Sequence, residues 1–173
     1  MSLLRLHCAL MVCVLAGCAG PIDATESLPI ATRDRFELVS GVLEASCGSL
    51  DCHGQVGRNL RIYSQLGLRQ DTSEFPGLDA GVPSAREVDS NYRAATSLEP
   101  ELLSLVVGDQ GKDPERLTLV RKARGAEEHK GGKAIATGGA ADRCLISWLA
   151  SRVDESACAE GAVIARPDVV PPR

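Results

Sequence analysis

The clearest stretch of helical hydrophobic spacing lies near the start of the folded part of the chain. Residues 33–46 place apolar side chains three and four positions apart, which predicts an amphipathic helix. Its apolar face consists of Phe36, Val39, Val42 and Leu43. Gly41 lies within this segment and weakens a helix by about 1 kcal/mol relative to alanine. We expect the helix to run directly into Cys47.

Two further helices are predicted in the second half of the chain. A short helix is expected over Pro100–Val107, because proline suits a first helical turn and the following Gly108 suits a helix end. A longer one is expected over Ala141–Val153. Its apolar side consists of Cys144, Leu145, Trp148 and Leu149. The resulting fold class is mainly α-helical.

The segments between these helices carry no regular hydrophobic pattern. Residues 47–99 are expected to be mostly irregular, and within them residues 71–90 are expected to form a long surface loop. Residues 108–140 are rich in glycine and polar residues and contain one apolar patch, Leu117–Val120. The helices should therefore be joined by long irregular loops.

Length, charge and composition narrow the class of protein. The 173 residues suffice for one domain, predicted over residues 33–160, with a disordered tail over residues 161–173. A net charge of −4 argues against nucleic-acid binding. The sequence has no serine-hydrolase elbow, zinc-peptidase or phosphate-loop motif, so we expect no enzyme. Aromatic residues make up only 3%, which indicates a modest core stapled by disulfides or completed by a large apolar cofactor.

The first residues are predicted to be an export signal. Residues 1–17 combine a positive start with an apolar run that is too short to span a bilayer. They lead into Leu15–Cys18, which resembles the bacterial lipobox, and this implies that Cys18 becomes the lipid-modified first residue. Residues 18–32 are then a tether. The protein is expected in the cell envelope, and Ala19 favours the outer membrane over the inner one by resemblance to Gram-negative lipoproteins.

The segment Cys47–His53 carries the most informative chemical pattern. Cys47 and Cys52 are separated by four residues, and His53 follows directly. It resembles the C-x-x-C-H motif of c-type cytochromes, in which both thiols bond haem vinyl groups and the histidine ligates iron. Attachment at two points fixes the ring so that the adjacent histidine lies beneath the iron. The two additional residues of the spacing must loop out.

Taken by themselves, these residues are compatible with two other structures. Cys47 and Cys52 could form a disulfide across a small loop, leaving His53 as an ordinary polar residue. They could also bind zinc together with His53 and His129. Exported thiols seldom stay reduced, which disfavours zinc.

Two segments near the end of the domain extend the resemblance to cytochromes c. Glu128–Gly132 and Asp142–Leu149 are similar to the cytochrome c domains of planctomycete-type proteins, which carry an H-x-G-G stretch and then a terminal helix ending in a W-I or W-L pair. The upstream Leu117–Lys122 fits the same pattern. The resemblance covers about residues 33–152. It implies a small cytochrome c-like helical domain, in which the first helix leads into the haem motif and packs across the last one.

The resemblance implies His53 as one ligand of the haem iron and leaves the other open. Met1 and Met11 are the only methionines, and both precede the expected cut, as does His7. His129 is the one histidine left for the second position. The glycines that follow it would let the backbone approach a flat ring. As an alternative, His129 is a solvated residue of a charged loop.

The remaining cysteines of the mature chain are Cys144 and Cys158, on and just beyond the last predicted helix. A disulfide between them would stabilise the fold by about 3 kcal/mol. Arg121, Lys122 and Arg124 form a small basic cluster. This cluster is either a solvated face or a contact for haem propionates or an acidic redox partner.

Two functional hypotheses follow. The first is a lipid-anchored, c-type cytochrome-like protein that binds haem c and transfers electrons outside the cytoplasm, with the membrane and a redox protein as partners. The second is a non-redox surface lipoprotein with two disulfides, acting as a structural or binding module.

Overall fold

The computed structural model describes residues 28–70 and 81–163, which form helices without any β-strand. The elements are α2 (Phe36–Cys47), α3 (Ala85–Thr96), α4 (Pro100–Gly108), the 3-10 turn η1 (Pro114–Arg116), α5 (Thr118–Arg124), α6 (Ala140–Leu149) and α7 (Glu155–Gly161). The expected all-helical fold class is thus confirmed. The predicted signal peptide, the lipid attachment at Cys18, most of the tether and residues 164–173 of the tail lie outside the described residues.

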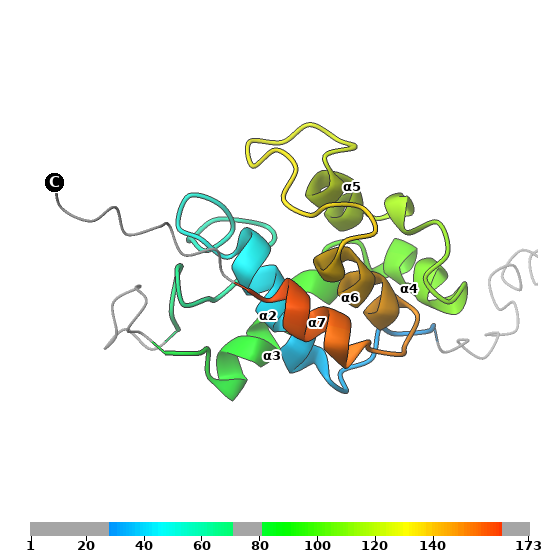
Figure 1. Ribbon diagram of the computed structural model, residues 1–173, viewed down its shortest axis with the longest axis horizontal. Helices are drawn as coiled ribbons and strands as arrows, with labels where there is room; N and C mark the ends of the chain where they lie inside the picture. The colour runs from blue at the N-terminus through cyan, green and yellow to red at the C-terminus, as the bar shows by residue number, and fades with distance from the viewer. Residues whose placement is uncertain (1–27, 71–80, 164–173) are drawn as a thin grey trace, which may run out of the picture.

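Helices α2, α6 and α7 pack against one another at the centre of the molecule (Figure 1). The rings of Phe36 on α2 and Trp148 on α6 lie 5.2 Å apart between centroids, and both side chains are fully buried. The Trp148 indole N–H donates to the Thr32 carbonyl at 2.8 Å and so holds the segment before α2 on the core. Gly41 lies where α2 meets α7, since a Cβ there would be 3.3 Å from the Ala162 Cβ.

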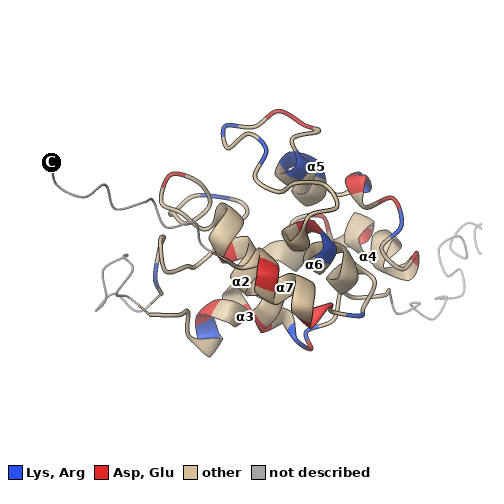
Figure 2. Cartoon of the chain, viewed as in Figure 1, with Lys and Arg blue, Asp and Glu red and all other residues tan. Residues whose placement is uncertain are grey.

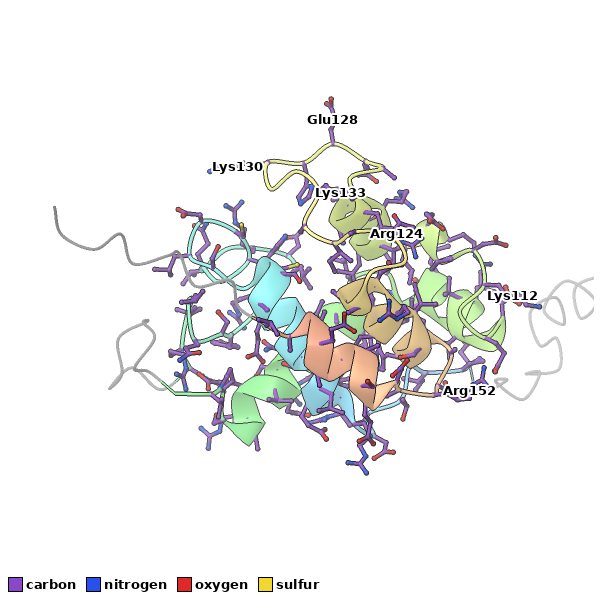
Figure 3. All side chains as sticks on the ribbon, in the orientation of Figure 1. Lys112, Arg124, Glu128, Lys130, Lys133 and Arg152 are labelled. Atoms are coloured by element: carbon purple, nitrogen blue, oxygen red, sulfur yellow. A yellow bond between two sulfur atoms is a disulfide. The ribbon has the colours of Figure 1, made fainter. Side chains whose placement is uncertain are left out.

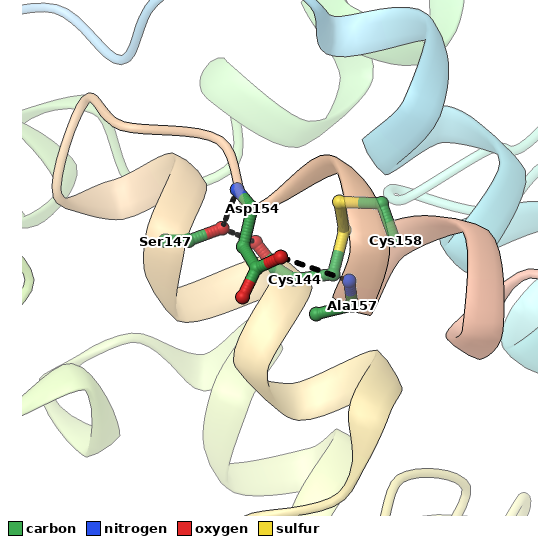
Figure 4. Close-up of a disulfide and its surroundings, with 5 residues drawn as sticks. All are labelled: Cys144, Ser147, Asp154, Ala157 and Cys158. Carbon is green, nitrogen blue, oxygen red and sulfur yellow. Dashed lines mark hydrogen bonds between the residues drawn. A yellow bond between two sulfur atoms is a disulfide. The ribbon is translucent and has the colours of Figure 1, made fainter.

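A disulfide joins Cys144 on α6 to Cys158 on α7, as predicted (Figure 4). Both cysteines are fully buried. The α7 helix begins at a capping residue, Asp154, whose carboxylate accepts from the Ala157 N–H at 2.9 Å. The Ser147 hydroxyl accepts from the Asp154 N–H at 2.8 Å, which fixes the turn between the two helices.

The expectation of irregular structure over residues 47–99 is wrong in its last third, because α3 begins at Ala85, inside the predicted surface loop. Ser84 and Glu87 form a capping box that starts this helix. The buried residues of α3 are Glu87, Asn91 and the small Ala95, so hydrophobic periodicity does not mark this face. The Asn91 amide bonds both the N–H and the carbonyl of Tyr63, and the Glu87 carboxylate pairs with Arg69.

Two helices of seven residues each were also missed by the hydrophobic pattern. The patch Leu117–Val120 opens α5 rather than interrupting a polar loop. The residues that follow the predicted last helix form α7, which ends at Gly161. The expected tail, residues 161–173, therefore begins at the last residue of this helix. The predicted helix Ala141–Val153 is shorter at its end, since α6 stops at Leu149. Among the described helices, none combines the length and apolar content needed to cross a bilayer.

Candidate functional site

The Cys47–His53 segment forms a closed turn at the end of α2. The His53 N–H donates to the Cys47 carbonyl at 2.9 Å, which folds the segment back on the last helical residue. The Cys52 N–H donates to the Ser49 carbonyl at 3.0 Å. Leu50 and Asp51 are exposed on the outside of this turn. The longer spacing between the cysteines is therefore accommodated by residues that loop out.

Glycines allow this turn to pack directly on the chain that follows it. A Cβ at Gly54 would lie 1.9 Å from the Gly48 carbonyl oxygen, and one at Gly67 would lie 2.1 Å from the same atom. The Ser64 hydroxyl donates to that carbonyl, and the Leu68 N–H donates to the Gly54 carbonyl at 2.6 Å. These contacts of the backbone and of the Ser64 hydroxyl fix the turn without using the thiols of its two cysteines.

The hydrogen bonds of His53 determine which of its ring nitrogens carries a proton. Its Nδ1–H donates to the Leu60 carbonyl oxygen at 2.7 Å, and a carbonyl can only accept. Burial lowers the pKa of His53, and the nearby positive charge of Arg58 and Lys122 and the proximity of His129 act in the same direction, against the opposing effect of the Leu60 bond. The neutral ring therefore presents an unprotonated Nε2, which is the form that binds a metal.

The two cysteines of the turn are free thiols. Cys47 is buried and Cys52 is partly buried. Burial raises the pKa of Cys47 to about 12, with a smaller contribution from Cys52, so this thiol is protonated at neutral pH. No group of three histidine, cysteine or acidic side chains in the described ranges is arranged to hold a metal ion, so the zinc hypothesis gains no support.

His129 lies in the loop between α5 and α6, which projects from the top of the molecule in Figures 1 and 3. The loop is attached at its return by the Ala134 and Ile135 N–H groups, which both donate to the Ala123 carbonyl. Near its start, Glu127 pairs with basic residues of α5. Gly131 packs on the His129 ring, since a Cβ there would lie 2.9 Å from Nε2. The His129 Nδ1 is buried and has no hydrogen-bond partner.

Two adjoining cavities, of about 230 Å³ and about 280 Å³, lie beside the turn. Four residues line both of them, namely Cys47, His53, His129 and Ala134. We call the pair the crevice. It brings together residues from the end of α2 and from the loop after α5, which are far apart in the sequence. Cys52 lines the second cavity, so all four residues predicted for cofactor binding face one crevice.

The walls of the crevice differ between its two halves. The first cavity has aliphatic walls that include Leu60, Leu98, Leu119 and Ala123, and it also carries the charged residues Glu99 and Lys122. The second carries Arg58, Lys130 and Asp51 beside the cysteines. Sequence reasoning missed Leu60, Leu98 and Arg58, because their segment has no pattern that separates a cavity wall from a surface loop. The Leu60 carbonyl that accepts from His53 has no sequence signal either, because every residue carries such an acceptor.

The basic cluster of α5, blue in Figure 2, divides its side chains between different partners. Arg121 pairs with Glu127 on the His129 loop at 2.8 Å. Arg124 forms a bidentate pair with the buried Asp142 at the start of α6 and also contacts Glu115. Of the three, only Lys122 lines the crevice. A role in contacting an anionic ligand there is therefore open to Lys122 and not to the other two.

The chain was compared with protein-family models, curated proteins and solved structures, and none of them matches it. The chemistry of the crevice is therefore inferred from the residues that line it. These supply two thiols, one unprotonated imidazole nitrogen, a second imidazole with a buried unpaired nitrogen, and an apolar wall with cations at its edge.

Proposed function

We propose that the protein binds haem c in the crevice and carries electrons, as a c-type cytochrome-like protein rather than an enzyme. Cys47 and Cys52 would hold the porphyrin by thioether bonds, each thiol adding across one vinyl group. His53 would ligate the iron through Nε2, and His129 would supply the second imidazole. Bound haem supplies a one-electron iron couple.

The observation that carries this proposal is the convergence of both thiols and both imidazoles on the crevice. A buried imidazole nitrogen without a partner is costly unless a ligand satisfies it, and His129 Nδ1 is such an atom. A thioether carries no ionisable proton, which suits the buried position of Cys47 better than a thiolate does.

The residues around the ligands have separate roles in the proposed site. The Leu60 carbonyl fixes the orientation and basicity of His53. Leu98 and Leu119 in the first cavity would shield the haem from water, which helps to set the reduction potential. Lys122 and Arg58 can balance the carboxylates of the porphyrin. Because methionine occurs only at positions 1 and 11, an imidazole is the available second ligand and the potential is expected to be low.

The fold is consistent with the cytochrome c-like architecture that the sequence resemblance implies. The first described helix, α2, ends at Cys47 and packs against α6, which carries the Cys144–Leu149 segment. We also propose that the protein is exported and anchored through a lipid on Cys18, in the outer membrane in preference to the inner one. The Cys144–Cys158 disulfide supports an oxidising compartment.

The decisive experiment is to produce the protein with and without a c-type maturation system. With it, haem should stay on the chain in a denaturing gel, and the reduced spectrum should show a sharp α-band. Cys52→Ser should weaken or remove the haem stain, while Ser49→Ala in the same turn should keep it. A wild-type protein that carries no haem under these conditions would contradict the proposal.

The second candidate function is a non-redox lipoprotein module that uses the same fold. It requires a disulfide between Cys47 and Cys52, and these residues are free thiols in the structure. Mass spectrometry under non-reducing conditions separates the two functions. A mass lower by two hydrogens at these cysteines without a haem adduct would favour the module.

A further inference from the structure

A second surface feature lies next to the crevice and shares Arg58 and Asn59 with it. It is a shallow depression of about 400 Å³ between the chain after His53 and the end of α3. Its lining includes three arginines, Arg58, Arg61 and Arg93, together with Asn59, Ser90 and Ser97. We call it the arginine basin. Among the residues that the structure describes, none that lines it is acidic.

Each of the three guanidinium groups is held in place by a different contact. The Arg58 Nε–H donates to the Cys52 carbonyl at 3.1 Å. Arg61 lies over the ring of the buried Tyr63, with its guanidinium carbon 5.1 Å from the ring centroid. Arg93 pairs with Asp89 one turn earlier on α3. A guanidinium has five donors, so these contacts orient the groups and leave further N–H groups for a ligand.

The charge around the basin is opposite in sign to that of the whole chain. The chain carries a net charge of −4. Asp89 is the acidic neighbour on α3, and it is shared between Arg93 and Arg33, so its charge is more than balanced. A local positive surface on an acidic protein orients an approaching acidic partner toward that surface and away from the rest.

The shape of the basin favours a protein partner over a small ligand. Arg58, Asn59, Arg61 and Arg93 are all exposed, so a small anion bound here would stay largely in water. Binding sites for small molecules enclose most of the ligand surface. An acidic protein surface can place several carboxylates on the three guanidinium groups at once, and each carboxylate can be bound through two hydrogen bonds.

We infer that the arginine basin is a docking site for an acidic protein surface. Arg58 and Asn59 line the crevice as well as the basin, so a docked partner lies directly beside Cys52 and His53. The inference goes beyond the proposed function, because docking on the arginines requires no haem. If haem is bound, the same position brings the partner to its edge.

The test measures binding of a fluorescein-labelled octaglutamate peptide to the purified full-length chain, by anisotropy at low ionic strength. The pair Arg61→Gln and Arg93→Gln should weaken binding about fivefold or more, as expected for the loss of two charge contacts. Lys112→Gln with Arg152→Gln is the matched control. This pair removes the same amount of positive charge from the loops after α4 and α6, where Figure 3 labels Lys112 and Arg152. It should change binding less than about twofold.

Three results would overturn the inference. Equal weakening by both pairs would show a net-charge effect without a site. Absence of peptide binding to the wild type would also overturn it. Binding to phosphatidylglycerol vesicles that depends on Arg61 and Arg93, with no such dependence for the peptide, would assign the basin to a membrane surface instead. If the first pair misfolds by circular dichroism, Arg58→Gln with Arg93→Gln leaves the Arg61–Tyr63 contact in place and tests the same point.

Discussion

The central helices and the crevice beside them are held together by different forces. In α2, α6 and α7, large apolar side chains such as Phe36 and Trp148 are fully buried, and one disulfide links two of the helices. Around the crevice, glycine contacts and backbone hydrogen bonds at Gly48, Gly54 and Gly67 maintain the turn. The difference shows how the chain can hold a site in place while its thiols and imidazoles stay available for a ligand.

The largest expected effect comes from placing a side chain in the glycine contacts. Gly54→Ala should destabilise the protein by about 3 kcal/mol or more, although it removes no apolar surface, because its Cβ would overlap the Gly48 carbonyl. This loss should match that of Phe36→Ala in the core. Urea unfolding of protein made without haem measures both. Gly108→Ala is the control, since a Cβ there meets only Pro29 at 3.5 Å. A Gly54→Ala protein as stable as that control would refute the role assigned to the turn.

The disulfide provides the next comparison. Replacing both Cys144 and Cys158 by alanine should lower the free energy of unfolding by about 3 kcal/mol, because the crosslink closes a loop with a sequence separation of 14. The crevice should be preserved, since neither cysteine lines it. Cys52→Ala removes a thiol outside the core and should cost less than about 1 kcal/mol. If the double variant and Cys52→Ala lose the same free energy of unfolding, the crosslink itself contributes nothing beyond the packing of its side chains.

Glu44 lies at the boundary between the two regions and makes stability depend on pH. Burial raises its pKa from 4.5 to about 7, the Ser40 hydroxyl bond and Arg69 oppose this, and Glu87 adds to it. An acid whose pKa is higher in the folded chain loses stability as pH rises from its unfolded value toward the folded one.

Glu44→Gln should therefore stabilise the protein by about 2 kcal/mol at pH 8 and leave it unchanged at pH 4. The amide oxygen can still accept from the Ser40 hydroxyl, which donates to Glu44 at 2.6 Å. Chemical unfolding at both values measures the effect. Glu101→Gln, on the exposed side of α4, is a control that should show no such dependence. A gain of equal size at pH 4 and pH 8 would exclude titration of Glu44 as the cause.

Substitutions in the His129 loop should change stability least. Their effect is measured on the spectrum of the proposed haem. Gly131→Ala should displace the imidazole, because the added Cβ would lie 2.9 Å from Nε2. The haem protein should then become partly high-spin and bind carbon monoxide, and His129→Ala should make this complete. Lys130→Ala in the same loop should leave the spectrum unchanged. If His129→Ala has no spectral effect, His129 is not an iron ligand, whereas haem attachment at Cys47 and Cys52 is unaffected by that result.

Hydrophobic spacing predicted the helices that bury apolar faces and missed those that do not. Residues 33–46 were located closely because their buried residues repeat at helical intervals, and Pro100–Val107 because Pro100 and Gly108 mark its two ends. The buried residues of α3 are Glu87, Asn91 and Ala95. The polar partners of Glu87 and Asn91 lie elsewhere in the chain. Its capping box at Ser84 and Glu87 was a readable signal that hydrophobic analysis does not use. Helices α5 and α7 are too short for a periodic pattern to stand out.

The sequence by itself determined the helical fold class, the Cys144–Cys158 pair and the candidate residues for a cofactor site, because each depends on residue type and local spacing. Only the tertiary structure decided that the Cys47–Cys52 thiols stay unpaired, that His129 approaches His53, and that Lys122 lines the crevice while Arg124 turns to Asp142. These features depend on how the folded chain brings distant segments together. The two histidines, for example, are 76 residues apart in the sequence (129 − 53 = 76). Local preferences carry no information on that path until the core and the glycine contacts bring the segments together.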